Sequence, residues 1–141
     1  MTSTSVQLWT HFQLDLPCSF NRKEAKDHGE GGVIVGASLQ HKRLMVIDDV
    51  ITAGTAIRES FDIIKRHEAE LGGVLVALDR QEKGATSDKS AIQEVEREFG
   101  IKVKAIVGLE HLVEYLTEKR EEYKVQLEEI VEYRKTYGVV A

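Results

Sequence analysis

The chain has 141 residues, of which 42% are hydrophobic and 30% are charged, values that are ordinary for a globular protein. This length allows one domain with a single core, and the net charge of −5 argues against a nucleic-acid-binding surface. No apolar run approaches the length of a membrane span, and the first twenty residues lack the pattern of a signal peptide. The single cysteine, Cys18, excludes an internal disulfide and weakly favours a cytoplasmic setting.

The N-terminal part of the chain shows little regular pattern. Residues Met1 to Thr10 are rich in Ser and Thr and have no hydrophobic periodicity, so we expect them to be poorly ordered. We therefore expect an irregular segment over residues 1–13 and one domain over residues 14–141. Within that domain, Leu14–Phe20 and Gly32–Gly36 are candidates for short strands on either side of a polar loop.

A strand, a turn and a helix follow. Four consecutive apolar residues, Leu44–Ile47, predict a strand that is buried on both faces. Residues Ala56–Leu71 carry apolar side chains on one helical face, and Gly72 and Gly73 stand where a helix C-terminal cap is expected. Val74–Leu78 is a second apolar run and predicts a parallel strand.

The C-terminal half continues this alternation. Ser90 and Gln93 have the spacing of a capping box, which predicts a helix that ends at Gly100. The remaining elements are expected to be a strand and two helices: Val103–Val107, Leu109–Leu116 and Glu121–Tyr137. Strands that alternate with helices indicate an α/β fold with a mainly parallel sheet flanked by helices.

The stretch from Asp48 to Ala56 is the first candidate site. The end of a parallel strand beside a helix N-terminus presents backbone N–H groups and a positive dipole, which suit a phosphate, while the carboxylates of Asp48 and Asp49 suit ribose hydroxyls. A structural interpretation is equally open on spacing alone, because the two Asp residues can end the strand and cap the helix, and Thr52 or Thr55 can also serve as the cap. The stretch has neither the Walker motif nor the dinucleotide-binding motif.

The segment Asp48-Asp49-Val50-Ile51-Thr52-Ala53-Gly54-Thr55 resembles the phosphoribosyl pyrophosphate motif of the type I phosphoribosyltransferases. The resemblance implies the fold of that family, with an acidic pair that holds the ribose hydroxyls and contributes to catalysis, and a turn that surrounds the 5′-phosphate. The substrate-binding residues implied here are Asp48, Asp49, Val50, Ile51, Thr52, Ala53, Gly54, Thr55 and Ala56.

A polar, glycine-rich segment from Asn21 to Gly32 is the second candidate. Taken alone it is more often a solvated loop of mixed charge, although such a loop can also close over a polyanion and exclude water. Its sequence resembles the flexible catalytic loop of the orotate phosphoribosyltransferases. The resemblance implies that Lys26 is the principal catalytic residue and that the loop, residues 22–32, reaches the neighbouring subunit of a homodimer. The residues implied to engage pyrophosphate are Arg22, Lys23 and His28.

The third candidate is Leu78-Asp79-Arg80-Gln81-Glu82. Arg80 follows a predicted parallel strand, where open α/β sheets bind ligands, and an Arg there can pair with a carboxylate in bidentate fashion. For an isolated Arg a surface salt bridge would be the better interpretation. The segment again resembles the orotate phosphoribosyltransferases, and the resemblance implies that Arg80 and Thr52 contact orotate.

The likeness runs from about Leu14 to the C-terminus and implies an enzyme of pyrimidine biosynthesis. Such an enzyme transfers phosphoribosyl from phosphoribosyl pyrophosphate to orotate and releases orotidine 5′-monophosphate and pyrophosphate, with Mg²⁺ as cofactor and no metal site formed by the protein alone. A large segment that precedes the loop in this family is not found ahead of Leu14, so we expect an N-terminally incomplete fold with uncovered apolar faces. The alternative is a truncated, non-catalytic phosphoribosyl pyrophosphate-binding remnant or regulator, and a transferase for another nucleobase is disfavoured by the loop.

Overall fold

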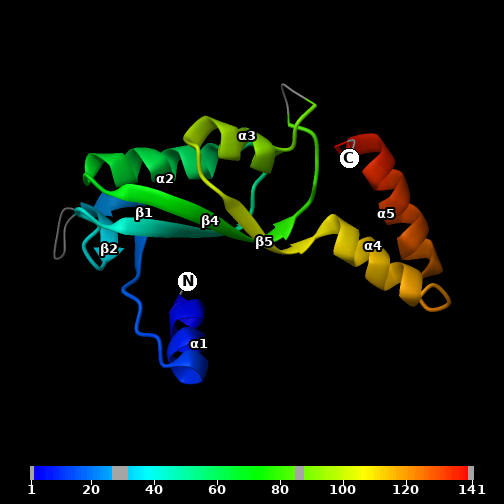
Figure 1. Ribbon diagram of the computed structural model, residues 1–141, viewed down its shortest axis with the longest axis horizontal. Helices are drawn as coiled ribbons and strands as arrows, with labels where there is room; N and C mark the ends of the chain where they lie inside the picture. Colours follow the sequence, from blue (N-terminus) through cyan, green and yellow to red (C-terminus); the bar gives the residue numbers. More distant parts are fainter. Residues whose placement is uncertain (1, 27–31, 85–87, 140–141) are drawn as a thin grey trace.

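A computed structural model describes residues 2–26, 32–84 and 88–139, with the side chains of all but 23–26 and 32. Its centre is a parallel sheet of three strands in the order β3-β4-β5, with one face covered by helices α2 and α3 (Figure 1). The bounds of these elements are β3 (Arg43–Val50), α2 (Thr55–Arg66), β4 (Glu70–Asp79), α3 (Ala91–Phe99) and β5 (Val103–Gly108). This arrangement confirms the predicted α/β fold with a parallel sheet.

The core lies between the sheet and the two helices. Apolar side chains from the covered face of the sheet meet those on the inner faces of α2 and α3, and Val76 and Val95 are fully enclosed. The cluster comprises Ile51, Ile57, Ile64, Leu71, Val74, Val76, Ala91, Val95 and Val103. Its burial holds the C-terminal end of β3 and the N-terminal end of α2 in fixed positions.

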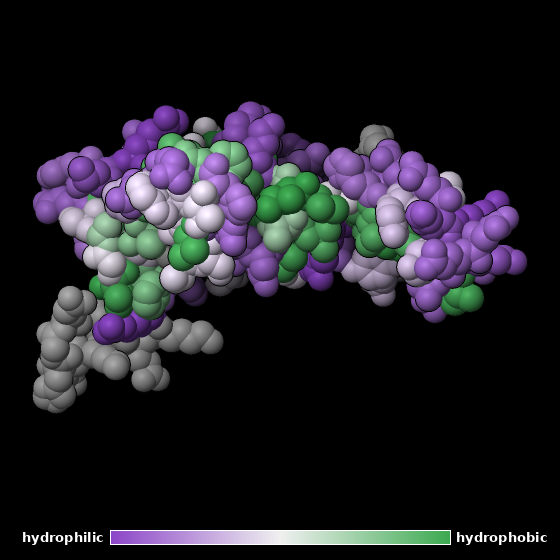
Figure 2. Space-filling model, turned by 90° about the horizontal axis from the view of Figure 1, so that it is seen from below, coloured by the Kyte–Doolittle hydropathy of each residue, from purple (hydrophilic) through white to green (hydrophobic). Residues whose placement is uncertain are grey.

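The opposite face of the sheet is open. Burial alternates along β3, so that Met45 is 61% exposed and Ile47 39% exposed, and Ile106 on β5 is 70% exposed. Seen from the side opposite to α2 and α3, apolar residues gather on this face (Figure 2). The prediction of a strand buried on both faces is therefore wrong, because side chains alternate between the two faces and helices cover only one. The expectation of an uncovered apolar face is confirmed.

The N-terminal segment is helical. Helix α1 spans Thr2–Phe12, and the backbone and side chain of Gln13 both bond to the carbonyl of Trp9 at its end, at 3.0 and 2.9 Å. The prediction of an irregular N-terminal segment is wrong for these residues. A helix without a buried face needs no hydrophobic periodicity, and no residue of α1 is buried.

An antiparallel hairpin precedes the sheet. Strand β2 (Gly32–Gly36) agrees with the prediction, whereas β1 (Ser19–Lys26) begins later than expected and continues into the segment predicted as a loop. Cross-strand pairing explains this extension, since Asn21 pairs with Ile34. The rest of the predicted loop, residues 27–31 with His28 among them, lies outside the described residues.

Helix α2 ends at Arg66, five residues before the predicted end. Glu68, at φ 53, turns the chain there, and Gly72 and Gly73 lie inside β4. The prediction that these glycines cap the helix is wrong. They allow close strand packing instead, because a Cβ atom on Gly73 would lie 3.2 Å from the Lys102 carbonyl oxygen.

The C-terminal elements follow the predicted order. The capping box of Ser90 and Gln93 starts α3, and Gly100 ends it in a left-handed conformation, as predicted. Helices α4 (Leu109–Glu118) and α5 (Lys124–Tyr137) lie beyond the end of the sheet (Figure 1). Among the described residues, no helix has the length and apolar character needed to cross a membrane.

Candidate functional site

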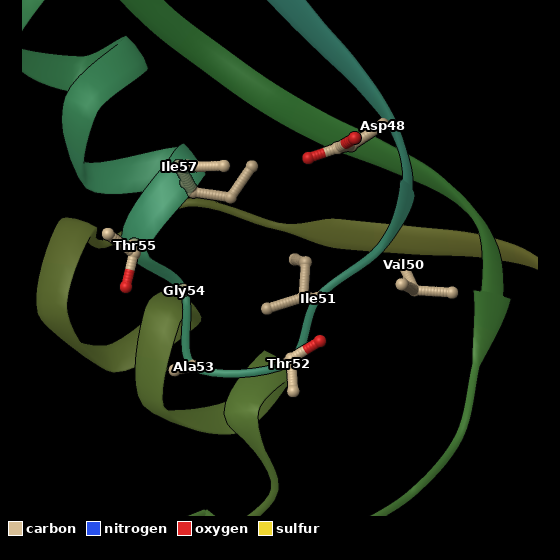
Figure 3. Close-up of a pocket in the computed structure, with 9 residues that line it drawn as sticks. Asp48, Val50, Ile51, Thr52, Ala53, Gly54, Thr55 and Ile57 are labelled. Carbon is tan, nitrogen blue, oxygen red and sulfur yellow. The ribbon is translucent and has the colours of Figure 1, made fainter.

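The candidate site is a cavity of about 250 Å³ between the end of β3 and the start of α2 (Figure 3). The chain curves around it, and the carboxylate of Asp48 points across it toward Ile57. The lining residues are Asp48, Val50, Ile51, Thr52, Ala53, Gly54, Thr55, Ala56 and Ile57. Eight of these nine residues belong to the stretch from Asp48 to Ala56 that the sequence analysis identified. The predicted turn therefore surrounds a single cavity.

The two aspartates are not equivalent. Asp48 is half-buried and lines the cavity, while Asp49 is exposed and does not line it. Alternation along the strand explains the difference, because neighbouring side chains point to opposite faces. Each carboxylate accepts one backbone N–H group from the next residue, Asp48 from Asp49 at 3.0 Å and Asp49 from Val50 at 2.7 Å.

Helix α2 begins without a side-chain cap. Its N-cap residue is Gly54, at φ 72, and no side chain bonds to the N–H groups of the first turn, which also contains no acidic residue. The structural alternative, in which Thr52 or Thr55 caps the helix, is therefore wrong. Gly54 is required here, since a Cβ atom would lie 3.0 Å from Val95 and the positive φ disfavours other residues. The uncapped N–H groups and the helix dipole favour an anion at this end.

Arg58 braces the turn from within α2. Its Nη1 donates to the carbonyl oxygen of Ala53 at 2.6 Å, and its Nε and Nη2 bond to the carboxylate of Glu98 on α3, with Nη2 at 2.7 Å. The hydrogen bond with Glu98 raises the pKa of Arg58, and the same bond lowers the pKa of Glu98. Sequence reasoning missed this pair, because forty positions separate the two residues and neither belongs to a local motif.

Arg80 lies beside the turn, close to Thr52. Its Nη2 atom is 3.5 Å from the hydroxyl oxygen of Thr52, at the outer limit of a hydrogen bond, and 2.8 Å from the carboxylate of Glu82. The hydroxyl of Tyr133 on α5 donates to the other oxygen of Glu82, and this bond raises the pKa of Tyr133. The structure thus brings together Thr52 and Arg80, and it adds contacts to Glu82 and Tyr133, two residues to which the sequence analysis assigned no role.

The described part of the predicted catalytic loop, residues 22–26 and 32, does not line this cavity. Arg22, Lys23 and Lys26 belong to β1, and the β1–β2 hairpin lies near the end of the sheet where β3 and β4 begin (Figure 1). The turn after β3 is at the opposite end. Among the described residues of one chain, therefore, the structure does not join the two predicted halves of the site.

No group of three or more His, Cys, Asp or Glu side chains in the described part of the chain is arranged to hold a metal ion. The neighbouring carboxylates of Asp48 and Asp49 are nevertheless of the kind that Mg²⁺ accepts. That ion commonly takes only one or two protein carboxylates and completes its shell with water and substrate phosphates. The donor set at the turn therefore fits a magnesium ion that arrives with a phosphorylated ligand.

Comparison with known proteins gives a consistent result. The chain is 56% identical over 140 residues to an orotate phosphoribosyltransferase of Shewanella oneidensis, and 57% identical over 145 residues to one of Colwellia psychrerythraea, with 99% and 98% of this chain covered. The chain belongs to the orotate phosphoribosyltransferase family. It spans 64% and 65% of the lengths of these two relatives. No family model matches the chain.

A solved orotate phosphoribosyltransferase structure from Francisella tularensis supports the same assignment at the level of the fold. The structures align with a TM-score of 0.82 and 37% sequence identity, over 97% of this chain and 63% of the other. The arrangement of sheet, turn and helices described above is thus that of the orotate phosphoribosyltransferase family.

Proposed function

We propose that the chain carries out phosphoribosyl transfer from phosphoribosyl pyrophosphate to orotate, which yields orotidine 5′-monophosphate and pyrophosphate. The observation that carries this proposal is the convergence of Thr52 and Arg80 beside the cavity of the turn, since the two residues are 28 positions apart in the sequence. A hydroxyl and a guanidinium beside a phosphate-binding turn suit a ligand that carries both a phosphate and a carboxylate.

The donor substrate would be held at two points. The uncapped N-terminus of α2 and the turn from Thr52 to Ala56 would bind the 5′-phosphate, because their N–H groups and the helix dipole favour an anion. Asp48 and Asp49 would accept hydrogen bonds from the ribose hydroxyls. We expect the closer contact from Asp48, because its carboxylate lines the cavity.

The chemistry would be displacement at the anomeric carbon. A ring nitrogen of orotate, which gives up its proton to water, forms a bond to this carbon while the bond to pyrophosphate breaks, so positive charge grows on the ribose and negative charge on the leaving group. Lys26, with Arg22, Lys23 and His28, would stabilise the leaving group. Mg²⁺, held by the diphosphate of the donor and by Asp48 or Asp49, would neutralise part of the same charge.

We also propose a homodimer in which the loop of residues 22–32 reaches the site of the neighbouring subunit. The position of the hairpin, at the end of the sheet away from the turn, supports this proposal (Figure 1). Two subunits would then complete each site, with the turn from one and the loop from the other.

This arrangement predicts complementation between inactive variants. Lys26→Ala removes the principal catalytic cation of the loop, and Asp48→Asn removes the carboxylate proposed to bind the ribose. Each variant alone is therefore expected to be nearly inactive. Mixed in equal amounts and allowed to exchange subunits, they should recover about a quarter of the wild-type rate, because half of the dimers are mixed and each mixed dimer has one intact site. Recovery no greater than the sum of the separate rates would contradict sites shared between subunits.

The contact between Arg58 and Ala53 predicts a role in shaping the turn. Arg58→Lys keeps a positive charge but loses the bidentate bond to Glu98, so the turn should be less well held. We expect phosphoribosyl pyrophosphate to bind several-fold more weakly by calorimetry, by about 1 kcal/mol. Arg66→Lys, the same change at the other end of α2, serves as the control. Equal affinity in Arg58→Lys and wild type would show that the brace does not shape the binding site.

The ion pair between Arg58 and Glu98 should also depend on pH. Because the bond to Arg58 lowers the pKa of Glu98, the pair is fully present above the ordinary pKa of a glutamate and is lost as the pH falls through the lowered value. The difference in donor affinity between wild type and Arg58→Lys should therefore shrink only in acid below the ordinary glutamate range.

The proposed activity can be tested by following the absorbance of orotate with phosphoribosyl pyrophosphate and Mg²⁺ present. Orotate consumption with stoichiometric release of pyrophosphate would support the transferase. Binding of phosphoribosyl pyrophosphate without any turnover would favour the non-catalytic binding module instead.

A further inference from the structure

We propose that Glu82 and Tyr133 are positioning residues that fix the guanidinium of Arg80 in the orientation needed to receive a substrate carboxylate. This inference rests on the proposed function, because it takes Arg80 as the group that meets the carboxylate of orotate. It assigns a role in substrate binding to the C-terminal helix α5, which contributes no residue to the cavity of the turn.

A continuous chain of polar contacts carries the proposal. Tyr133 donates its hydroxyl hydrogen to one oxygen of Glu82, and the other oxygen of Glu82 is 2.8 Å from Nη2 of Arg80. The same Nη2 atom is 3.5 Å from the hydroxyl of Thr52. The side chains of Arg80 and Glu82 are only 34% and 21% exposed, so solvent screens their pairing less than it would on an open surface.

The backbone fixes the distance between α5 and this pair. The segment after Arg80 is joined to the end of α5 by hydrogen bonds from Lys83 N to Tyr137 O and from Val139 N to Gln81 O, both 2.9 Å. Gln81 adopts a left-handed conformation at φ 53, and its N–H group donates to the carboxylate of Asp79 at 2.9 Å. The position of Tyr133 over Glu82 is therefore set by the main chain.

The two carboxylate oxygens of Glu82 explain why both Glu82 and Tyr133 are needed to position Arg80. A carboxylate bonded only to Arg80 could rotate and take the guanidinium with it, whereas one anchored at its second oxygen by Tyr133 has a defined plane. Because an Arg side chain has many rotamers, fixing its plane in advance lowers the entropic cost of binding a planar carboxylate. Nε of Arg80 is shielded from solvent and has no hydrogen-bond acceptor among the described groups, so the guanidinium retains an unsatisfied donor that an acceptor on a ligand would stabilise.

Removal of one hydroxyl group tests the proposal. In Tyr133→Phe we expect the dissociation constant for orotate, measured by calorimetry with phosphoribosyl pyrophosphate present, to rise about tenfold. The affinity for phosphoribosyl pyrophosphate alone should not change. Tyr137→Phe is the matched control, because Tyr137 lies on the same helix with its ring 4.9 Å from that of Tyr133 and is 55% exposed.

A double-mutant cycle separates positioning from a general effect on the fold. If Tyr133 acts through Arg80, then Tyr133→Phe should cause no further loss of orotate affinity in an Arg80→Ala background. An additive loss in that background, or an equal loss in Tyr137→Phe, would overturn the proposal.

A measurement without any ligand distinguishes this inference from the proposed function. In nitrogen-15 NMR spectra, the guanidinium of Arg80 should rotate slowly in the wild-type chain and faster in Tyr133→Phe. If the wild-type chain binds no orotate but shows this change, the positioning role stands and the proposed substrate is wrong. Identical rotation in the wild type and Tyr133→Phe would overturn the positioning role whether or not orotate binds.

Discussion

Replacement of Lys26 by alanine is expected to lower the turnover of orotate by at least about 10²–10³-fold, the effect of removing one preorganised donor from a developing charge. The donor should still bind at the turn, since the contacts proposed for its 5′-phosphate and ribose come from residues after β3. Steady-state kinetics should therefore show a loss of kcat, and calorimetry should show a nearly unchanged dissociation constant for phosphoribosyl pyrophosphate.

The control for this variant is Lys42→Ala. Lys42 is an exposed lysine between the hairpin and β3, and no role in the site is assigned to it. Its replacement changes the net charge by the same amount and should leave turnover unaffected. Wild-type turnover in Lys26→Ala would remove Lys26 from the role of principal catalytic residue.

The second large effect is expected at the acidic pair. Asn in place of both Asp48 and Asp49 removes two charged acceptors for the ribose hydroxyls, each worth about 1.5–3 kcal/mol, so phosphoribosyl pyrophosphate should bind at least about a hundredfold more weakly. Because only Asp48 lines the cavity, Asp48→Asn alone should account for most of the loss and Asp49→Asn for less.

Calorimetry with phosphoribosyl pyrophosphate measures this effect directly, and Asp62→Asn, at an exposed position on α2, provides a control with the same change of charge as each single variant. Equal affinities in the double variant and in the wild type would mean that the aspartates have no part in donor binding. A larger loss in Asp49→Asn than in Asp48→Asn would contradict the role given to the lining of the cavity.

Local sequence patterns predicted most of the fold. The apolar runs at Val74–Leu78 and Val103–Val107 lie within parallel strands, and the capping box at Ser90 starts a helix as expected. These features depend on residues that are close together in the sequence, so they can be recognised from a single sequence. Gly72 and Gly73 misled the prediction, because their role depends on strands that are adjacent only in the folded chain.

The candidate site was predictable in part for the same reason. The turn from Asp48 to Ala56 is one continuous segment, so the sequence displays its residues together, and the resemblance implies a shared ligand for Thr52 and Arg80, whose Oγ1 and Nη2 atoms lie 3.5 Å apart. The supporting contacts were not predictable. Arg58 meets a partner forty positions away and Glu82 one fifty-one positions away, and such contacts leave no periodic signal.

The position of bound phosphoribosyl pyrophosphate tests the central claim most directly. A crystal structure of the chain with this donor and Mg²⁺ should place the 5′-phosphate at the N-terminus of α2 and the ribose hydroxyls against the carboxylate of Asp48. A donor bound with its phosphate and ribose away from the turn between β3 and α2 would contradict the account.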